Sequence, residues 1–314
     1  MHNNNYLKLI FLISKVLINI YFIGGVILNF SYKLGIDIGS TTIKLVVLDK
    51  DNQVVYKKYM RHLSEIYKSM HDNMILLSDT LKNHKFTCAI TGSAGMGMAN
   101  NLNMPFVQEV IACSKAVKNW IPQTDVAVEL GGEDAKITYF GSAPEQRMNG
   151  VCAGGTGSFI DHMASLLNTD AMGLNELAQK GTQIYTIASR CGVFAKTDVQ
   201  ALLNDGVSKA DIALSILQAV VNQTIGNLAQ GRPLEGNIAF LGGPLYFLTQ
   251  LKERFIKTLK LTDEHIVNVD DGCYFVAMGC ALSDNAIEMT YDELMQRLNN
   301  CSKSSTDCAL RTTR

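Results

Sequence analysis

The sequence predicts an α/β protein made of two related domains that face each other across a cleft. From residue 32 onward, short apolar strands alternate with amphipathic helices, and this order of elements starts again after Pro122. The restart repeats a motif of acid, glycine and lysine, because one offset of 92 residues separates three pairs of residues: Asp37 and Glu129, Gly39 and Gly131, and Lys44 and Lys136. A repeat of this kind is typical of one structural unit used twice.

The composition excludes several classes of protein. Among 314 residues, 47% are apolar, so the chain can bury sizeable cores and is not intrinsically disordered. The 28 Lys and Arg residues are balanced by 29 Asp and Glu residues, so the chain lacks the basic excess that a dedicated nucleic-acid binder needs. Eight cysteines are too sparse for a secreted disulfide scaffold. We therefore expect a cytoplasmic protein whose thiols are buried, catalytic or metal-binding.

Residues 1–31 form an apolar N-terminal extension that is separate from the two domains. Its only charged residues are Lys8 and Lys15, and the 17 uncharged residues between Lys15 and Lys33 approach the length of a membrane-spanning helix. No small-residue cleavage site follows the extension, and the pattern of strands begins directly after it. The extension is interpreted either as a membrane anchor or as a start codon assigned too far upstream.

The first predicted domain covers residues 32–122. A polar turn at residues 49–52 separates its second and third strands. Ser64 is expected to cap the first long helix, which runs to about Lys82. The apolar pattern gives four strands and two helices in all: strands at Leu34–Ile38, Ile43–Leu48, Val54–Met60 and Phe86–Thr91, and helices at about 64–82 and 107–119.

The second predicted domain covers residues 123–272 and contains more helix than the first. A capping box at Thr290–Glu293 then begins a terminal helix, and from Asn299 the chain reads as a polar tail without pattern, so residues 287–314 are predicted as a terminal helix and a disordered tail. The pattern predicts strands at Asp125–Leu130, Ala135–Phe140, about 146–148, Asn237–Leu241 and His265–Val269, and helices at about 155–167, 193–204 and 208–229.

The repeated motif has the form of a phosphate-binding turn. Each copy is a strand that ends in an acid, a tight turn of small residues and a second strand, and the exposed N–H groups of such a turn can cradle phosphate oxygens. In the first copy, Ser40, Thr41 and Thr42 add hydroxyl donors, and Lys44 adds a positive charge if its side chain points back toward the turn. The alternative is a pair of ordinary hairpins with surface glycines, which the recurrence of the motif disfavours.

The acids of the two motifs suit a metal ion better than a phosphate group. Asp37 and Glu129 each stand two residues before a glycine, and their negative charge would repel a phosphate. Hydrated Mg²⁺ keeps several waters and bridges carboxylates to phosphates. We expect both acids to order metal-bound water, and Glu129 is also a candidate to position an attacking water. A third glycine pair, Gly242 and Gly243, lies between a strand and a helix, where the chain can approach a flat ring closely.

Together these three stretches resemble the acetate and sugar kinase, chaperone and actin superfamily. The segment 37–42 is similar to its first phosphate motif, 129–132 to its second and 241–243 to its adenosine motif. The resemblance implies two RNase-H-like, actin-like domains with ATP in the cleft between them and a helix at about 274–286 that returns to the first domain. The cofactor-binding residues that it implies are Gly39, Ser40, Thr41, Thr42, Lys44, Gly131, Gly132, Asp134, Lys136, Gly242 and Gly243.

Two cysteines stand in similar settings. Cys152 and Cys191 each precede a helix, where the helix dipole favours a thiolate. Iron–sulfur clusters and structural zinc normally take four ligands, so one chain offers too few, whereas a two-fold dimer would supply four if both cysteines lie at its axis. The alternative is that both are small buried residues. Cys88, Cys113, Cys273 and Cys280 fall in apolar segments and are predicted to be core, whereas Cys301 and Cys308 are predicted to be incidental residues of the tail.

The segments 149–159 and 189–195 resemble the cysteine motifs of the 2-hydroxyacyl-CoA dehydratase activators, which are related to benzoyl-CoA reductase ATPase subunits. The resemblance implies a homodimer that holds one 4Fe-4S cluster with Cys152 and Cys191 of each subunit. It also implies that ATP·Mg²⁺ binding and hydrolysis drive a low-potential electron to a 2-hydroxyacyl-CoA dehydratase-like partner, and that ferredoxin or flavodoxin supplies the electron. The segments 145–150 and 242–246 are most similar to the activator-like domain of large fused proteins of anaerobes.

Two positions depart from the motif of the activators. Glu129 and Glu133 stand where many activators carry Asp or Gln, and added negative charge near the γ-phosphate predicts slow hydrolysis. Two other functions stay open at this point. A sugar or amino-sugar kinase of the same fold would need a base aspartate and no cysteines, and a degenerate nucleotide-binding domain from a larger fused protein would need neither activity nor cluster.

Overall fold

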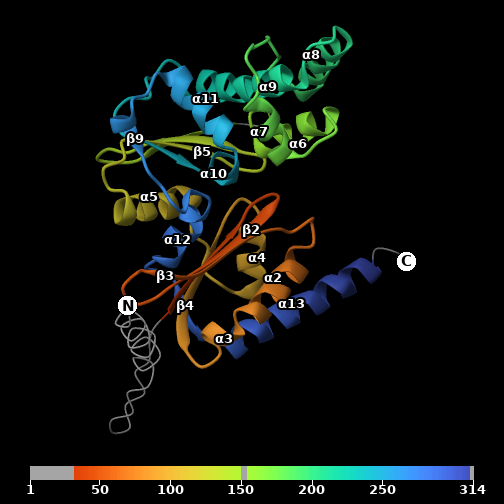
Figure 1. Cartoon of the computed structure of the whole chain (residues 1–314). Coiled ribbons are helices and arrows are strands. Elements are labelled where there is room, and N and C mark those ends of the chain that lie inside the picture. Colours follow the sequence, from red (N-terminus) through yellow and green to blue (C-terminus); the bar gives the residue numbers. More distant parts are fainter. Residues whose placement is uncertain (1–31, 150–153, 312–314) are drawn as a thin grey trace, which may run out of the picture. The chain divides into compact units, whose positions relative to one another are not determined.

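The computed structural model describes the backbone of residues 32–149 and 154–311, with side chains to Cys301. Within these residues the chain forms two five-stranded mixed sheets with helices against them (Figure 1). The two sheets have the same core topology, in which an antiparallel hairpin is extended by a strand parallel to its first member. This arrangement is an α/β fold of the actin-like ATPase kind.

The first sheet has the strand order β10-β4-β1-β2-β3. β1 pairs antiparallel with β2 and parallel with β4, while β10 closes the edge of the sheet beside β4. Alternate residues of β1 point to opposite faces, so Leu34, Ile36 and Ile38 enter one apolar core and Gly35 faces the other side. The strands are β1 Tyr32–Ile38, β2 Thr42–Leu48, β3 Val54–Arg61, β4 Lys85–Thr91 and β10 Ile287–Thr290.

The second sheet has the strand order β7-β6-β5-β8-β9, so β5, β6 and β8 occupy the positions that β1, β2 and β4 occupy in the first. The repeated motif therefore falls at equivalent places in both sheets. The acid and the lysine of each copy are direct cross-strand partners, Asp37 with Lys44 and Glu129 with Lys136. The strands are β5 Val126–Leu130, β6 Ala135–Tyr139, β7 Glu145–Met148, β8 Ile238–Leu241 and β9 Ile266–Val267.

Two helices, α5 (Glu109–Trp120) and α12 (Phe275–Ala281), share one apolar core with both sheets. They pack closely because glycine lies at the contacts: a Cβ on Gly279 would lie 1.7 Å from the Ala112 carbonyl oxygen, and one on Gly35 would lie 1.9 Å from the Ala277 carbonyl oxygen. α12 thus lies against β1, within the span of the helix expected at 274–286. This shared core joins the elements that carry the two repeated motifs.

The other helices of the first sheet differ in part from the sequence prediction. The helix expected over 64–82 is two helices, α2 (Ile66–Leu76) and α3 (Ser78–Leu81), and Ser64 does not cap it because its φ of 66° places it in a turn. α4 (Gly95–Leu102) was not predicted. α13 (Tyr291–Arg311) begins at the expected capping box, in which Thr290 N donates to Glu293 Oε2 over 2.7 Å.

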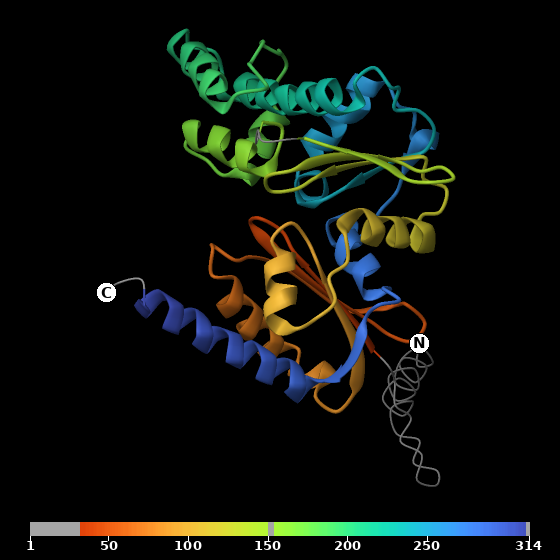
Figure 2. The same cartoon turned by 180° about the vertical axis from the view of Figure 1, so that it is seen from behind.

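Figure 2, seen from behind, shows α13 lying along α2 and α4 in front of the first sheet. The helix runs to Arg311 and does not end near Asn299 as the polar composition suggested. Cys301 is buried and its thiol donates to the Asn101 carbonyl oxygen over 2.9 Å, so it belongs to the packing of α13 and is not an incidental residue.

The helices of the second sheet pack against the face formed by Val126, Val128 and Leu130. α9 is capped by Ser208, whose hydroxyl accepts from Asp211 N, and it continues into a π-helix at Ile225–Ala229. Lys209–Ala229 is the one helix in the described part of the chain that is long and apolar enough to cross a membrane, but 78% of that window is buried in the core. The helices are α6 Gly157–Leu166, α7 Ala171–Ala178, α8 Gly192–Asn204, α9 Lys209–Thr224, α10 Gly243–Phe247 and α11 Thr249–Leu259.

Candidate functional site

The two repeated motifs fold into matching four-residue turns. The turn between β1 and β2 is closed by Gly39 N, which donates to the Thr42 carbonyl oxygen over 2.9 Å. The turn between β5 and β6 is closed in the same way by Gly131 N and the Asp134 carbonyl oxygen, over 2.8 Å. Matching turns at the ends of matching strands present matching sets of backbone N–H groups.

Each turn has a buried lysine behind it. Lys44 Nζ lies 3.1 Å from Asp37 Oδ2 and 3.4 Å from the position of a Cβ on Gly39, so its side chain points back toward the turn. Lys136 Nζ lies 2.6 Å from Asp134 Oδ2 and 3.8 Å from Glu129 Oε1. The expected positive charge therefore stands beside both turns.

A fourth carboxylate, which the sequence reasoning missed, completes this group. Glu109 begins α5, and it forms an ion pair with Lys136 of β6. The only local signal for Glu109 was an acid in the first turn of a helix, which is common and carries no functional meaning by itself. It reaches Lys136 because the shared core brings α5 against the second sheet.

Burial and the close approach of these charged groups shift the pKa values of their side chains. Burial raises the pKa of Glu129 to about 7, against the opposing effect of the Lys136 ammonium. Burial also raises the pKa of Glu109. Burial would lower the pKa of Lys136, but the carboxylates of Glu129, Asp134 and Glu109 outweigh it and hold that pKa well above its usual value. Lys136 is therefore a permanent cation, while Glu129 can exchange a proton near neutral pH.

The turns, the acids and the lysines line one small cavity of about 30 Å³. Residues of both sheets contribute to it: Asp37, Gly39, Ser40, Thr42, Lys44, Glu109, Glu129, Gly131, Gly132, Asp134 and Lys136. The structure thus brings together nearly all of the predicted phosphate- and metal-binding residues. A cavity of this volume holds about one water molecule.

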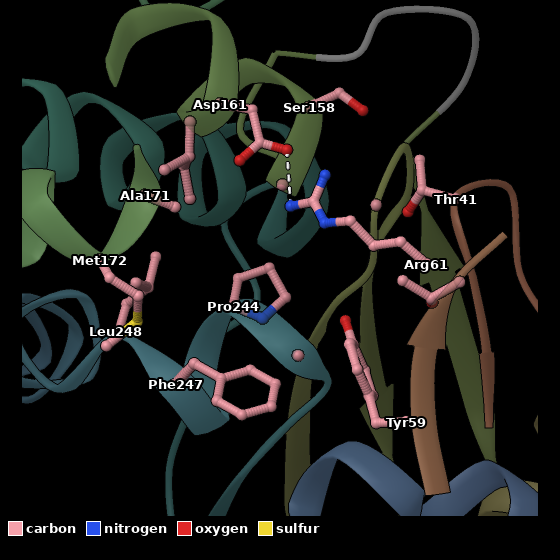
Figure 3. Close-up of a pocket in the computed structure, with 15 residues that line it drawn as sticks. Thr41, Tyr59, Arg61, Ser158, Asp161, Ala171, Met172, Pro244, Phe247 and Leu248 are labelled. Atoms are coloured by element: carbon pink, nitrogen blue, oxygen red, sulfur yellow. Dashed lines mark hydrogen bonds and ion pairs between the residues drawn. The ribbon is translucent and has the colours of Figure 1, made fainter. Parts of the chain in front are cut away.

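A larger cavity of about 220 Å³ adjoins the small one and shares Thr42 and Gly132 with it (Figure 3). Thr41 lines this cavity, as does Gly243 of the third glycine pair. Figure 3 shows the ring of Phe247, Pro244 and the ring of Tyr59 around the space, and the Arg61 guanidinium donating to Asp161 Oδ2 over 2.9 Å. Apolar walls with a few polar groups are typical of a small-molecule site.

Glycine is required at each position of the third pair, Gly242 and Gly243, for a different structural reason. Gly242 has a φ of 87°, and a Cβ there would lie 2.1 Å from the Leu130 carbonyl oxygen. Only glycine suits such a position, which is how β8 can turn into α10 directly beside the second turn. A Cβ on Gly243 would lie 2.5 Å from the hydroxyl of Tyr59 on β3. Gly242 also lines a third cavity together with Asp37, Lys44 and Glu129, so all three glycine-rich segments meet.

Tyr59, Arg61 and Asp161 were not predicted from the sequence. Tyr59 and Arg61 lie on β3 and Asp161 on α6, a hundred residues further along the chain than Arg61. They meet only because the fold brings β3 and α6 to the same cavity. No spacing within either element distinguishes them from ordinary surface residues.

Of the two predicted cluster cysteines, the structure describes one. Cys191 is the N-cap of α8 and is partly exposed as a free thiol. Cys152 lies outside the described residues. The next described residue after it is Gly154, where a Cβ would lie 2.6 Å from the Ser189 carbonyl oxygen and 2.8 Å from that of Arg190. The chain that follows Cys152 therefore packs against the chain that precedes Cys191.

The four cysteines that were predicted to be core are buried: Cys88, Cys113, Cys273 and Cys280. Burial raises the pKa of Cys273 to about 12. Among the residues that the structure describes, no group of three or more His, Cys, Asp or Glu side chains could hold a metal ion.

Two equivalent turns over a shared cavity, with a glycine pair beside them, define the class as an ATPase of the actin-like fold. Residues 34–282 match the BadF/BadG/BcrA/BcrD ATPase family, and the chain belongs to that family.

Its homologues are activating ATPases of 2-hydroxyacyl-CoA dehydratases. The (R)-2-hydroxyglutaryl-CoA dehydratase activating ATPase of Acidaminococcus fermentans is 29% identical over 225 residues, 68% of this chain and 82% of that protein. The crystal structure of component A of the (R)-2-hydroxyglutaryl-CoA dehydratase from Acidaminococcus fermentans superimposes with a TM-score of 0.67 at 25% identity, over 84% of this chain and 99% of that one. The activator of the 2-hydroxyisocaproyl-CoA dehydratase from Clostridium difficile, with bound ADPNP, has the same fold, with a TM-score of 0.67 at 21% identity over 88% of this chain and 97% of that one.

Proposed function

We propose that the chain is an ATP-dependent activator that delivers a low-potential electron to a 2-hydroxyacyl-CoA dehydratase-like partner. It works as a cytoplasmic homodimer that ferredoxin or flavodoxin reduces. The observation that carries the proposal is the pair of equivalent acid–glycine–lysine turns around one cavity, in a chain of this ATPase family. The electron-transfer part rests on Cys191 at the start of α8 and on the resemblance of the cysteine segments 149–159 and 189–195 to those of the activators.

ATP would use both cavities. The adenosine group occupies the larger cavity, against Pro244 and Phe247, and the phosphates extend past Thr42 and Gly132 toward the two turns. At about 30 Å³ the small cavity is too small to admit a triphosphate, so the turns must separate for ATP to enter and must close again on its phosphates before hydrolysis. They touch at present, because a Cβ on Gly132 would lie 2.2 Å from Thr41 Oγ1. Binding of ATP and movement of one sheet relative to the other are thus coupled.

Hydrolysis would depend on positioning and on charge neutralisation. Lys44 and Lys136 would offset negative charge on the phosphates, and Asp37 would hold Mg²⁺ through water. Glu129 accepts a proton from the attacking water, a role that suits a carboxylate with a pKa of about 7. Its raised pKa also means that a fraction is protonated at neutral pH, which agrees with slow turnover.

The cysteine segments fit a cluster shared between two chains. Cys191 is a partly exposed thiol at a helix N-terminus, and the chain next to Cys152 lies against the residues before it. A 4Fe-4S cluster normally takes four cysteine ligands, so Cys152 and Cys191 of two subunits would together hold one cluster. When bound, such a cluster supplies one-electron transfer. Val193 and Phe194, exposed by 72% and 66% directly after Cys191, give this end of α8 an apolar surface.

The test is the iron and acid-labile sulfide content of the full chain after anaerobic purification. We expect about four irons per dimer and a brown chromophore that dithionite bleaches. Cys191→Ala should lose the iron and keep ATP binding, while Cys113→Ala, which changes a buried core thiol, should keep both.

Other results would favour other functions. A colourless, iron-free protein that phosphorylates added sugars would replace the proposal with a kinase. An iron-free protein without ATPase activity would replace it with a degenerate domain. Iron that survives in variants of both Cys152 and Cys191 would contradict the assignment of the ligands.

A further inference from the structure

His62 is a buried residue directly behind the first phosphate turn, and the function proposed above gives it no role. It follows the last residue of β3, and its side chain is 4% exposed. Its ring contacts the turn through one nitrogen and the following loop through the other. A buried histidine with both nitrogens engaged holds its surroundings in one arrangement.

The partners of the two ring nitrogens define the tautomer. Nε2 lies 3.1 Å from the Gly39 carbonyl oxygen, and a carbonyl oxygen can only accept, so Nε2 carries the proton. Nδ1 lies 3.1 Å from Ser64 N, and a backbone N–H can only donate, so Nδ1 is the acceptor. The geometry therefore selects the neutral ring with hydrogen on Nε2.

The loop after His62 adopts a costly conformation to make the second of these bonds. Leu63 and Ser64 have φ values of 47° and 66°, in the left-handed region that residues other than glycine seldom adopt. Leu63 is also 80% exposed, which is unusual for a leucine, so packing does not explain the conformation. Strain that persists in a loop commonly marks a functional constraint. Here the conformation directs Ser64 N at His62 Nδ1.

His62 also controls which way the turn presents its backbone. Its ring holds the carbonyl of Gly39, and its own backbone N–H donates to the carbonyl of Thr41 over 3.2 Å. Each peptide unit is trans and planar, so its N–H points opposite to its carbonyl. The N–H groups of Ser40 and Thr42 therefore point away from His62. Ser40 and Thr42 line the small cavity, whereas His62 does not.

We propose that His62, as the Nε2–H tautomer, is a positioning residue that holds the first phosphate turn with its N–H donors directed at the phosphates of ATP. This role rests on the proposed binding of ATP. It gives the ring a specific task, because the side chain fixes the peptide between Gly39 and Ser40, while the backbone of residue 62 already fixes the one between Thr41 and Thr42.

Two variants and three ligands test the role. His62→Leu fills the same space but cannot donate to Gly39, whereas the amide of His62→Gln can still reach that carbonyl. In titration calorimetry on the full chain, His62→Leu should lower the affinity for ATP and for ADP by about tenfold, which is the effect of one oriented hydrogen bond. The affinity for adenosine should not change. His62→Gln should retain most of the affinity for ATP.

Several outcomes would overturn the role. One is that His62→Leu binds ATP as tightly as the wild-type protein does. Another is that His62→Leu loses affinity for ATP and for adenosine to the same extent, because that result would mean general damage to the cavity. A long-range ¹⁵N–¹H spectrum of the nucleotide-free protein gives an independent check, because a ring with hydrogen on Nδ1 would also contradict the role. A wild-type chain that binds no ATP would overturn the proposed function, and this role with it. A loss of ATP affinity in the His62 variants alone, with the wild-type chain still binding ATP, would leave the proposed function intact.

Discussion

Substitution of Gly132 by alanine should separate the two phosphate turns at their point of contact. The Cβ of such an alanine would lie 2.2 Å from Thr41 Oγ1, and real Cβ atoms do not approach other heavy atoms closer than 3.0 Å. Thr41 Cγ2 and Cβ would also be close, at 3.1 and 3.2 Å, so rotation of the hydroxyl alone gives limited relief. Gly132 does not have a positive φ, so the alanine adds no backbone strain and the effect is purely steric.

The magnitude follows from that distance. To reach 3.0 Å the two atoms must move apart by about 0.8 Å, and the groups that act on the phosphate move with them. A misplacement of about 1 Å can lower a rate by about a hundredfold. We therefore expect ATP hydrolysis by Gly132→Ala to fall by between about ten- and a hundredfold, with a smaller loss of ATP affinity because the open site still admits the nucleotide.

A phosphate-release assay and a rescue variant test this reasoning. The added substitution Thr41→Ala removes the hydroxyl and the methyl group that the new Cβ meets, so the double variant should recover much of the lost rate. Gly97→Ala on α4 is the matched control, because a Cβ there meets nothing within 4 Å. Unchanged hydrolysis by Gly132→Ala, or no recovery in the double variant, would refute the view that the two turns act on ATP in the contact seen here.

Three other predictions concern the same site. Burial raises the pKa of Glu129 from 4.5 to about 7, so ionising this carboxyl group is less favourable in the folded state than in the unfolded state. The free energy of unfolding of the wild-type protein should therefore fall as the pH rises from about 5 through 7. Glu129→Gln removes that dependence and should be more stable than wild type by up to about 3 kcal/mol at about pH 8; parallel denaturation curves of the two proteins would count against it. Gly39→Val should weaken ATP binding in calorimetry by at least about tenfold, because a Cβ there already lies 3.4 Å from Lys44 Nζ, while Gly39→Ala fits; equal affinities in both variants would exclude the first turn as a phosphate site. Chelation of Mg²⁺ should lower the affinity for ATP but not the affinity for adenosine. Equal affinity for ATP with and without Mg²⁺ would contradict a metal-assisted site.

The features predicted well from the sequence are those encoded by spacing within short segments. The constant offset between the motifs appears in the structure as identical cross-strand pairing, Asp37 with Lys44 and Glu129 with Lys136. A hairpin of fixed loop length determines which residues face each other, so a repeated spacing predicts a repeated geometry. The capping box at Thr290 is local in the same sense and was also predicted correctly.

The features missed depend on contacts between distant segments. Ser64 had the sequence of a helix cap, but its N–H is taken by the ring of His62, and α2 begins two residues later. β10 is four residues long and is a strand because it pairs with the edge of β4. Glu109 reaches Lys136 through packing of α5 on the second sheet. None of these contacts leaves a periodic trace in the sequence.

The balance of charge in the small cavity explains why ATP should arrive there with a metal ion. Four carboxylates face two ammonium groups: Asp37, Glu109, Glu129 and Asp134 against Lys44 and Lys136. A triphosphate adds more negative charge, so the lysines alone cannot neutralise it. Hydrated Mg²⁺ would supply the missing positive charge, because it keeps several waters and can bridge carboxylates to phosphates.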